Sequence, residues 1–334
     1  MRKLLLLILF ILIGAVGYHL FQMVKKPPRP VSGPMVIKAE PLVLDSSNPQ
    51  RTRLGSLYFL GAWQLSGRDR SFGGLSSLVL LPNGRMQALS DGAVLYSFPY
   101  PGMDGMGQVK PLPTMRDRAS RRWLPGSSDS ESMVLDPETG QIWVGFELNQ
   151  AICRYAPGAM RLEKCHIWPE MKDWVYTSSI ESLARLPDGR FMAIAEGAYG
   201  TKEGRDVLLF SGDPADRRTK SPVKMRYMPP AGYDPTDAVA IGGGQLLVLN
   251  RRATLYDGFT AILTVVDINA MVPGKMLPSR EVARFVPPVL ADNFEALAYQ
   301  KQADGQRILW VLSDDNHLIF QRTLLLKFAL PDRL

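Results

Sequence analysis

One sequence pattern, two short apolar stretches joined by a tight turn, recurs five times at intervals of roughly 50 to 60 residues. The clearest copy reads ESLARL (181–186), then the turn Pro187-Asp188-Gly189, then a second stretch (190–195) that is followed by Glu196. Asn-Gly and Asp-Gly between apolar stretches are strong hairpin signals, because both central turn residues need positive φ. The other copies begin at Ser76, Glu131, Asp237 and Glu295. The pattern therefore predicts five β-hairpins in a repeat architecture.

Further strand-like stretches follow these hairpins, and they complete a four-stranded unit. In the third unit they are residues 207–211 and 223–228, and in the fourth 261–267 and 281–286. Four strands per repeat are typical of a blade of a β-propeller. We therefore predict an all-β fold, a β-propeller with five blades. Six blades are the alternative if region 36–63 and a long insertion build another, and a β-sandwich is the rival fold.

The last repeat has three strand-like stretches, ending with 324–330. The stretch SLYFLGAWQL (56–65) precedes the first repeat and has no hairpin partner of its own. We expect it to supply the outer strand of the last blade, because this pairing would leave no open sheet edge between the first and last blades.

The N-terminal 24 residues differ in character from the rest. Arg2 and Lys3 precede an apolar run from Leu4 to Val16, which is typical of a secretory signal. Apolar residues continue to Val24, about the 20 residues that cross a bilayer. We predict a signal peptide or membrane anchor (1–24), a spacer with an N-terminal extension (25–54) and a propeller domain (55–334). The protein is expected to be periplasmic or otherwise extracytoplasmic, either secreted or attached to the inner membrane by a single N-terminal span.

The formal charge of +7 does not indicate a nucleic-acid-binding protein. Five of the positive charges lie within the first 29 residues, so the remainder is near neutral and lacks a concentrated basic footprint. The two cysteines, Cys153 and Cys165, flank a Pro-Gly turn and would face each other across a hairpin. They form either a disulfide, in an oxidising compartment, or two buried free thiols.

Acidic residues recur where each hairpin begins and ends. In a propeller, the start of the first strand and the end of the second emerge on one face of the central channel, so ten positions are expected around one mouth. They are Ser76, Glu131, Glu181, Asp237 and Glu295 at the starts, and Asp91, Glu147, Glu196, Arg251 and Asp314 at the ends. Eight of the ten are acidic, and their repulsion favours a bound cation.

Oxygen ligands of this kind suit calcium, or magnesium with retained waters. We predict that the metal ligands come from Glu131, Glu181, Asp237, Glu295, Asp91 and Asp314. The alternative is that these carboxylates form a solvated rim or accept backbone N–H groups.

Basic residues accompany the acidic ones. Arg251 and Arg252 end the second stretch of the fourth repeat and would suit an anionic ligand, or else pair with neighbouring carboxylates. As catalytic candidates we select Glu147 or Glu196 as the base, with Arg251 and Arg252 neutralising developing charge. The sequence has no Gly-x-Ser-x-Gly elbow, P-loop or dinucleotide fingerprint.

Several segments match a known pattern, notably SFGGLSSL (71–78), DSESMVL (129–135) and DNFEALA (292–298), with SDDN (313–316) ahead of QRTLLL (321–326). Over about residues 55–330 the chain resembles the phytase-like propeller proteins of bacteria, the family labelled "esterase-like activity of phytase". The resemblance implies an envelope protein with calcium-dependent phosphoesterase or esterase activity.

Two functions follow as hypotheses. The first is a calcium-dependent hydrolase of phosphate or carboxylic esters, acting on a small anionic or ester substrate in the cell envelope. The second is a non-catalytic envelope propeller that binds a protein or glycan partner, for instance through an exposed aromatic patch around Trp123, Trp168 and Trp174.

Overall fold

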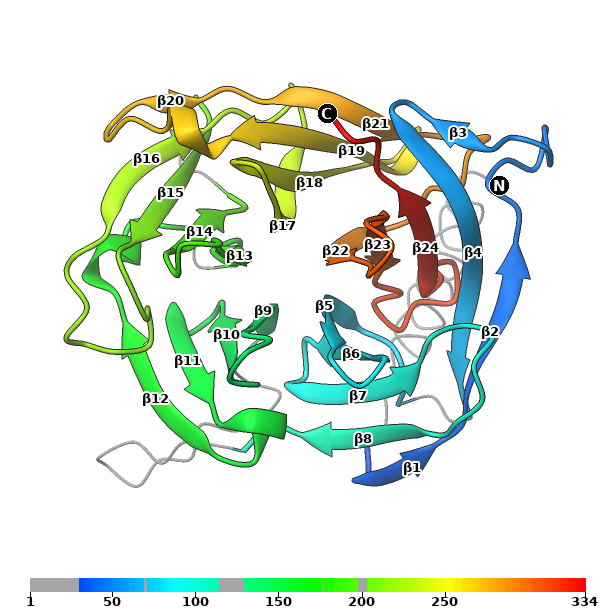
Figure 1. Ribbon diagram of the computed structural model, residues 1–334, viewed down its shortest axis with the longest axis horizontal. Helices are drawn as coiled ribbons and strands as arrows, with labels where there is room; N and C mark the ends of the chain where they lie inside the picture. The colour runs from blue at the N-terminus through cyan, green and yellow to red at the C-terminus, as the bar shows by residue number, and fades with distance from the viewer. Residues whose placement is uncertain (1–29, 69–70, 114–128, 176, 198–202) are drawn as a thin grey trace, which may run out of the picture.

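The computed structural model describes residues 30–68, 71–113, 129–175, 177–197 and 203–334. Five sheets, antiparallel apart from one short parallel pair in blade 3, are arranged in a ring (Figure 1) around a central channel that residues from all five sheets line. The predicted all-β fold with five blades is confirmed. The predicted N-terminal targeting segment (1–24) and the start of the spacer lie outside the described residues.

Each blade contains four strands that follow one another from the channel outwards. Blade 1 has β5 (Leu75–Leu81), β6 (Arg85–Ser90), β7 (Val94–Pro99) and β8 (Gly107–Pro111). Blade 2 has β9 (Ser130–Leu135), β10 (Ile142–Phe146), β11 (Ala151–Tyr155) and β12 (Leu162–Ile167). Blade 3 has β13 (Ile180–Arg185), β14 (Phe191–Ala195), β15 (Arg205–Phe210) and β16 (Val223–Tyr227), with β20 (Met276–Leu277) parallel to β16.

Blade 4 has β17 (Asp234–Gly242), β18 (Gln245–Thr254), β19 (Gly258–Asp267) and β21 (Arg280–Phe285). Blade 5 has β22 (Phe294–Lys301), β23 (Arg307–Ser313), β24 (Leu324–Ala329) and β4 (Leu57–Gly67). Three short 3-10 helices, η1 (Pro157–Ala159), η2 (Pro169–Met171) and η3 (Ile268–Ala270), lie in connections between strands. In the described part of the chain, no helix is long and apolar enough to cross a membrane.

The ring is closed by the N-terminal part of the domain. Strand β4 pairs antiparallel with β24, with Gln64 opposite Leu324 and Tyr58 opposite Ala329, so the predicted closure of the last blade is confirmed. Strand β2 (Ile37–Leu42) then pairs with β4, while β1 (Gly33–Met35) pairs with β8 of the first blade. The short β3 (Arg53–Leu54) also pairs with β4. The N-terminal extension therefore forms outer strands of the first and last blades, which it joins.

The hydrophobic core is divided among the five interfaces between neighbouring blades. Each of five buried apolar clusters draws its residues from two adjacent blades, for example Trp143 of blade 2 with Phe191 of blade 3. Inner strands are buried on both faces because they pack between two neighbours, and all five residues of β10 and of β14 are buried. The blades therefore hold one another in the ring through side-chain packing.

The direction of the strands defines the two ends of the channel. In every blade the first strand pairs antiparallel with the second, so Ile180 lies opposite Ala195 and Phe294 opposite Ser313. We call the end where first strands begin and second strands end the acidic mouth, after the carboxylates described below. The turns between first and second strands lie at the opposite end.

Candidate metal centre at the acidic mouth

Each innermost strand carries a β-bulge at its mouth end. The residues at the irregularities are Ser76, Glu131, Glu181, Thr236 and Glu295, one in each blade. A bulge adds an unpaired residue to one strand and redirects its side chain, and such bulges are frequent next to functional sites. Three of the five blades therefore present a glutamate at the same structural position around the channel axis.

Blade 4 departs from this pattern. Its bulge falls at Thr236, so the neighbouring Asp237 does not occupy the position of the three glutamates. Asp237 is buried, and its two carboxylate oxygens accept the backbone N–H groups of Ala238 and Leu297, both at 2.7 Å. Of the roles left open by the sequence for this residue, the structure shows the one in which its carboxylate accepts backbone hydrogen bonds, one from its own strand and one from blade 5.

Arg251 of β18 connects three blades at the acidic mouth. Its Nη2 lies 2.5 Å from Glu196 Oε1, and its Nη1 pairs with Glu295 Oε1. Nη1 also donates to Asn293 Oδ1 at 2.6 Å. The guanidinium group therefore compensates two carboxylates, one from blade 3 and one from blade 5.

Arg252 does not join this network. Neighbouring residues of a strand point to opposite faces, so Arg251 and Arg252 cannot both face the channel. Arg252 pairs instead with Asp257 at 2.8 Å and lies over the ring of Tyr233, with its Cζ 5.0 Å from the ring centroid.

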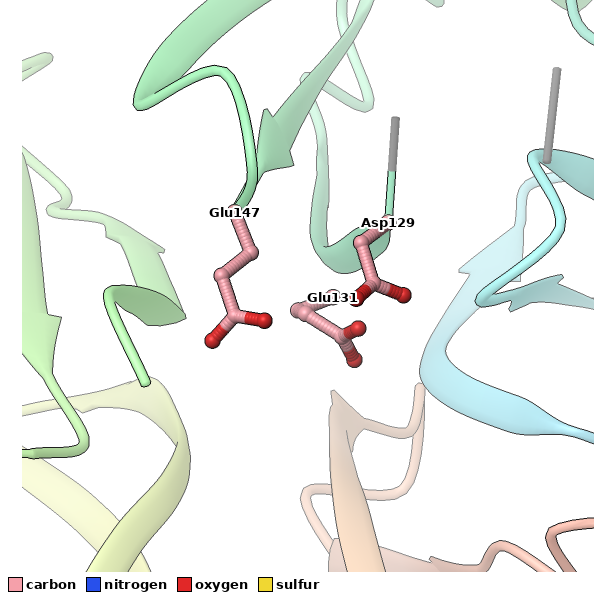
Figure 2. Close-up of side chains that lie close together, drawn as sticks. All are labelled: Asp129, Glu131 and Glu147. Carbon is pink, nitrogen blue, oxygen red and sulfur yellow. The ribbon is translucent and has the colours of Figure 1, made fainter. Parts of the chain in front are cut away.

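Three carboxylates converge at the acidic mouth (Figure 2). Asp129 precedes β9, Glu131 is the bulged residue of β9, and Glu147 follows β10. One carboxylate oxygen from each residue lies within 4.8 Å of those of the other two. Among the ion pairs formed by the described residues, none includes a member of this triad.

Asp129 was not among the ligands expected from the sequence. It lies just outside the hairpin repeat, where strand patterns give no information, and it adopts the left-handed region at φ 40°. The only signal was its place two residues before Glu131 in the segment DSESMVL. Glu147, expected as a base, is also a member of the triad, and its Oε1 accepts the backbone N–H of Ser179 at 2.9 Å.

The electrostatic cost of the acidic mouth is visible in its pKa values. Burial raises the pKa of Glu131 well above its ordinary value, and the neighbouring charges of Asp129 and Glu147 add to the effect. Burial likewise raises the pKa of Glu181, with contributions from Glu196 and Glu131. Burial raises the pKa of Glu147 to about 7. These carboxylates are short of positive charge, and a bound cation would offset their repulsion.

Asp314 and Asp91 lie on the side of the mouth formed by blades 5 and 1. Burial raises the pKa of Asp314, and its Oδ1 accepts the backbone N–H of Asn316 at 2.7 Å. Burial also raises the pKa of Asp91, although His317 opposes the shift. Asp91 Oδ1 and His317 Nε2 lie 2.9 and 3.0 Å from where a Cβ on Gly74 would be, so only glycine leaves room for both.

The donor set of the triad is suited to a hard divalent cation. All three side chains offer oxygen, which calcium and magnesium prefer, and there is no histidine or thiolate to favour a softer metal. Nearby, Glu295 Oε2 is buried and has no hydrogen-bond partner among the described residues, which leaves one further oxygen able to accept a cation. Asp129, Glu131 and Glu147 could therefore hold a metal ion.

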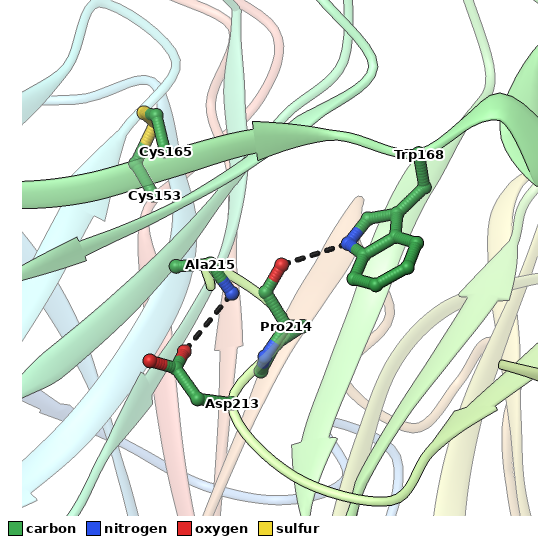
Figure 3. Close-up of a disulfide and its surroundings, with 6 residues drawn as sticks. All are labelled: Cys153, Cys165, Trp168, Asp213, Pro214 and Ala215. Atoms are coloured by element: carbon green, nitrogen blue, oxygen red, sulfur yellow. Dashed lines mark hydrogen bonds between the residues drawn. A yellow bond between two sulfur atoms is a disulfide. The ribbon is translucent and has the colours of Figure 1, made fainter. Parts of the chain in front are cut away.

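Two of the three tryptophans considered for a binding patch are not on the surface. Trp168 and Trp174 are buried, at 4% and 3% exposure. The indole N–H of Trp168 donates to Pro214 O at 2.7 Å (Figure 3). Trp123 lies outside the described residues.

Comparison with protein families gives one match over most of the chain. The model of the phytase-like family, described as "esterase-like activity of phytase", matches residues 70–317. The chain belongs to the phytase-like family. This match includes the triad, Arg251 and the other carboxylates of the acidic mouth. No curated protein sequence matches the chain significantly.

Several solved structures share a distant similarity in fold with this member of the phytase-like family. Hydrazine synthase from Kuenenia stuttgartiensis is 11% identical, with 78% of this chain and 74% of that chain covered and a TM-score of 0.41. A protein from Lactobacillus plantarum is 11% identical, with 85% and 79% covered and a TM-score of 0.39. A bifunctional GH43-CE protein from Bacteroides eggerthii is 11% identical, with 76% and 33% covered and a TM-score of 0.44. At these scores the similarities carry no argument about function.

Proposed function

We propose that the protein is a calcium-dependent hydrolase of phosphate or carboxylic esters. The observation that carries this proposal is the carboxylate triad Asp129, Glu131 and Glu147, which lacks a cationic side-chain partner among the described residues. Membership of the phytase-like family supports a hydrolase. Magnesium is the second candidate for the same oxygen ligands.

The roles of the mouth residues follow from their contacts. Asp129, Glu131 and Glu147 would hold the cation, which when bound would polarise the ester oxygen as a Lewis acid. We assign Glu196 as the base that takes a proton from the attacking water, since Glu147 belongs to the triad. Arg251 holds Glu196 and Glu295 in place by pairing with both, so it acts as a positioning residue. Arg252, paired with Asp257 away from the channel, has no part in this assignment.

Calcium binding to the full-length protein is expected to depend on the triad. We expect Glu131→Gln and Glu147→Gln each to weaken calcium affinity by at least about 10 to 100-fold. Removing a residue that only hydrogen-bonds to a metal ligand already causes a loss of about this size. The measurement is isothermal titration calorimetry with calcium, followed by hydrolysis assays on a phosphate monoester, a carboxylic ester and a lactone.

Asp188→Asn is the matched control, because Asp188 is an exposed carboxylate in the turn between β13 and β14, at the opposite end of the channel. It should bind calcium as the unmodified protein does. The hydrolase proposal fails if the calcium-loaded protein cleaves none of the three substrates, and the metal proposal fails if the triad variants bind calcium normally.

We further propose that the protein works outside the cytoplasm. Cys153 and Cys165 lie directly opposite each other on β11 and β12 and form a disulfide (Figure 3). Disulfides of this kind persist in oxidising compartments such as the periplasm and are rare in the cytosol. The disulfide therefore supports the extracytoplasmic location expected from the N-terminal apolar run.

Loss of the disulfide should destabilise blade 2. Its two cysteines are 12 residues apart in sequence, and a cross-link of about this size restricts the unfolded chain by about 3 kcal/mol. We expect a double Cys153→Ser, Cys165→Ser variant to have a free energy of unfolding lower by that amount, and therefore to unfold at a lower urea concentration. Urea denaturation monitored by circular dichroism measures the difference. Addition of a reductant should shift the unmodified protein in the same direction and leave the variant unchanged.

A further inference from the structure

Two hairpin tips at the acidic mouth expose large apolar side chains. Leu255 and Tyr256, between β18 and β19, are fully exposed, at 110% and 98%. Ile319 and Phe320, between β23 and β24, are each 71% exposed. Scattered single apolar residues are normal on protein surfaces, but two adjacent pairs on neighbouring blades are not.

Both pairs lie on the same end of the propeller. Strands β18 and β23 are the second strands of blades 4 and 5, and second strands end at the acidic mouth. Leu255 follows Arg251 by four residues along the chain, and Ile319 follows Asp314 by five. The two tips therefore border the mouth that holds the carboxylates.

Local geometry holds both pairs in exposed positions. Thr254 pairs with Gly258, which has φ +66°, so residues 255–257 form a three-residue hairpin loop closed by a left-handed glycine. In the other loop, Gln321 donates its backbone N–H to Leu318 O at 3.1 Å, which makes Ile319 and Phe320 the two central residues of a turn. Central turn residues point away from the strands, so neither pair can fold back onto its blade.

We propose that the two tips insert into the surface of a lipid bilayer, so that the acidic mouth faces the membrane. This inference does not rest on the hydrolase proposal. Short, separate, convex tips match a fluid bilayer, whereas a protein partner would need a complementary pocket for each. Tyrosine with aliphatic side chains is typical of residues at the membrane–water interface.

A positively charged side chain at the base of each tip supports a lipid bilayer as the surface that the tips contact. Arg252 precedes Leu255 by three residues, and Arg322 follows Phe320 by two. Their side chains keep 35% and 40% exposure, despite pairing with Asp257 and Asp292. Guanidinium groups placed beside inserted apolar residues can donate to lipid phosphate groups. The chain also carries the N-terminal apolar run, which would keep the propeller close to a membrane whenever it is retained.

Site-directed spin labelling of the full-length protein tests the insertion directly. Single Leu255→Cys and Phe320→Cys variants carry a nitroxide, and Met160→Cys and Met103→Cys serve as controls. The control residues are 75% and 59% exposed and lie in connections at the opposite end of the channel. The native cysteines are bonded to each other and do not compete for the label. Each variant is measured with and without phosphatidylcholine vesicles, using oxygen and a water-soluble nickel complex as collision reagents.

With vesicles, the labels at 255 and 320 are expected to shift from nickel-dominated to oxygen-dominated relaxation, while the controls remain nickel-dominated. The proposal is overturned if all four labels stay nickel-dominated, or if the controls shift instead, since the opposite end would then face the bilayer. Shielding of 255 and 320 from both reagents without vesicles would also overturn it, because a second copy of the protein would then cover the tips.

Discussion

Replacement of Arg251 by methionine is expected to lower the free energy of unfolding by about 3–5 kcal/mol, the usual cost of removing one partner from a buried charge pair. Arg251 pairs with Glu196 and Glu295, and both carboxylates are largely buried, with side-chain exposures of 13% and 10%. Without the guanidinium group, two negative charges would remain uncompensated between blades 3 and 5. Urea denaturation of the calcium-free protein near pH 7 measures the loss.

The adjacent arginine provides a matched control. Arg252 forms a half-exposed pair with Asp257, and such pairs contribute at most about 1 kcal/mol. Arg252→Met should therefore change stability little. Adding Glu196→Gln and Glu295→Gln to the Arg251→Met variant should recover part of the loss, because no buried charge is then left unpaired. Equal effects of the Arg251 and Arg252 substitutions would contradict the assigned network.

Without divalent cations, the protein is expected to become more stable as the pH is lowered from about 7 to about 4.5. Burial raises the pKa of Glu295 to about 7, although Arg251 opposes the shift, and burial raises the pKa of Glu147 to about 7. Their ordinary pKa is 4.5, so the folded protein binds protons more tightly than the unfolded chain in this window. Stability must then fall as the pH rises through it.

The expected change is a few kcal/mol, since each pKa unit corresponds to about 1.4 kcal/mol. Thermal or urea unfolding in a chelating buffer, at intervals between pH 4.5 and 7, gives the curve. Saturating calcium should flatten it, because the cation replaces the protons, and Glu295→Gln should reduce its slope. A free energy of unfolding that is constant or increases with pH across this window would contradict the raised pKa values of Glu295 and Glu147.

Much of the fold could be read from the sequence because propeller blades are local structures. The apolar stretches and turn residues of each hairpin lie within 20 residues of one another, as in Glu181 to Glu196, and β13 and β14 follow that pattern closely. Closure of the ring through β4 could also be inferred, since the last repeat lacked a strand and residues 56–65 lacked a partner. The position of the two cysteines opposite each other could be predicted from the symmetry of the hairpin. The sequence did not decide whether they form a disulfide or remain free thiols.

The direction of individual side chains at the mouth could not be read in the same way. The same hairpin pattern predicted that Asp237 and Arg252 belong with the metal ligands and catalytic residues. A one-residue shift of the bulge to Thr236 turns the Asp237 carboxylate to backbone N–H groups, and strand alternation turns Arg252 away from the channel. Asp129, which lies before its strand, enters the triad through a left-handed backbone conformation that no periodicity reveals.

By itself, the sequence predicted the propeller, with five blades favoured over six, the strand that closes the ring and the end of the channel where charge collects; the structure decided the number of blades. These features depend on hydrophobic periodicity and turn residues, which act over short distances along the chain. Only the tertiary structure decided which carboxylates meet, which are neutralised by Arg251 and which are bound to the backbone. Those contacts join residues from different blades, and their geometry depends on bulges and packing that a linear pattern does not encode.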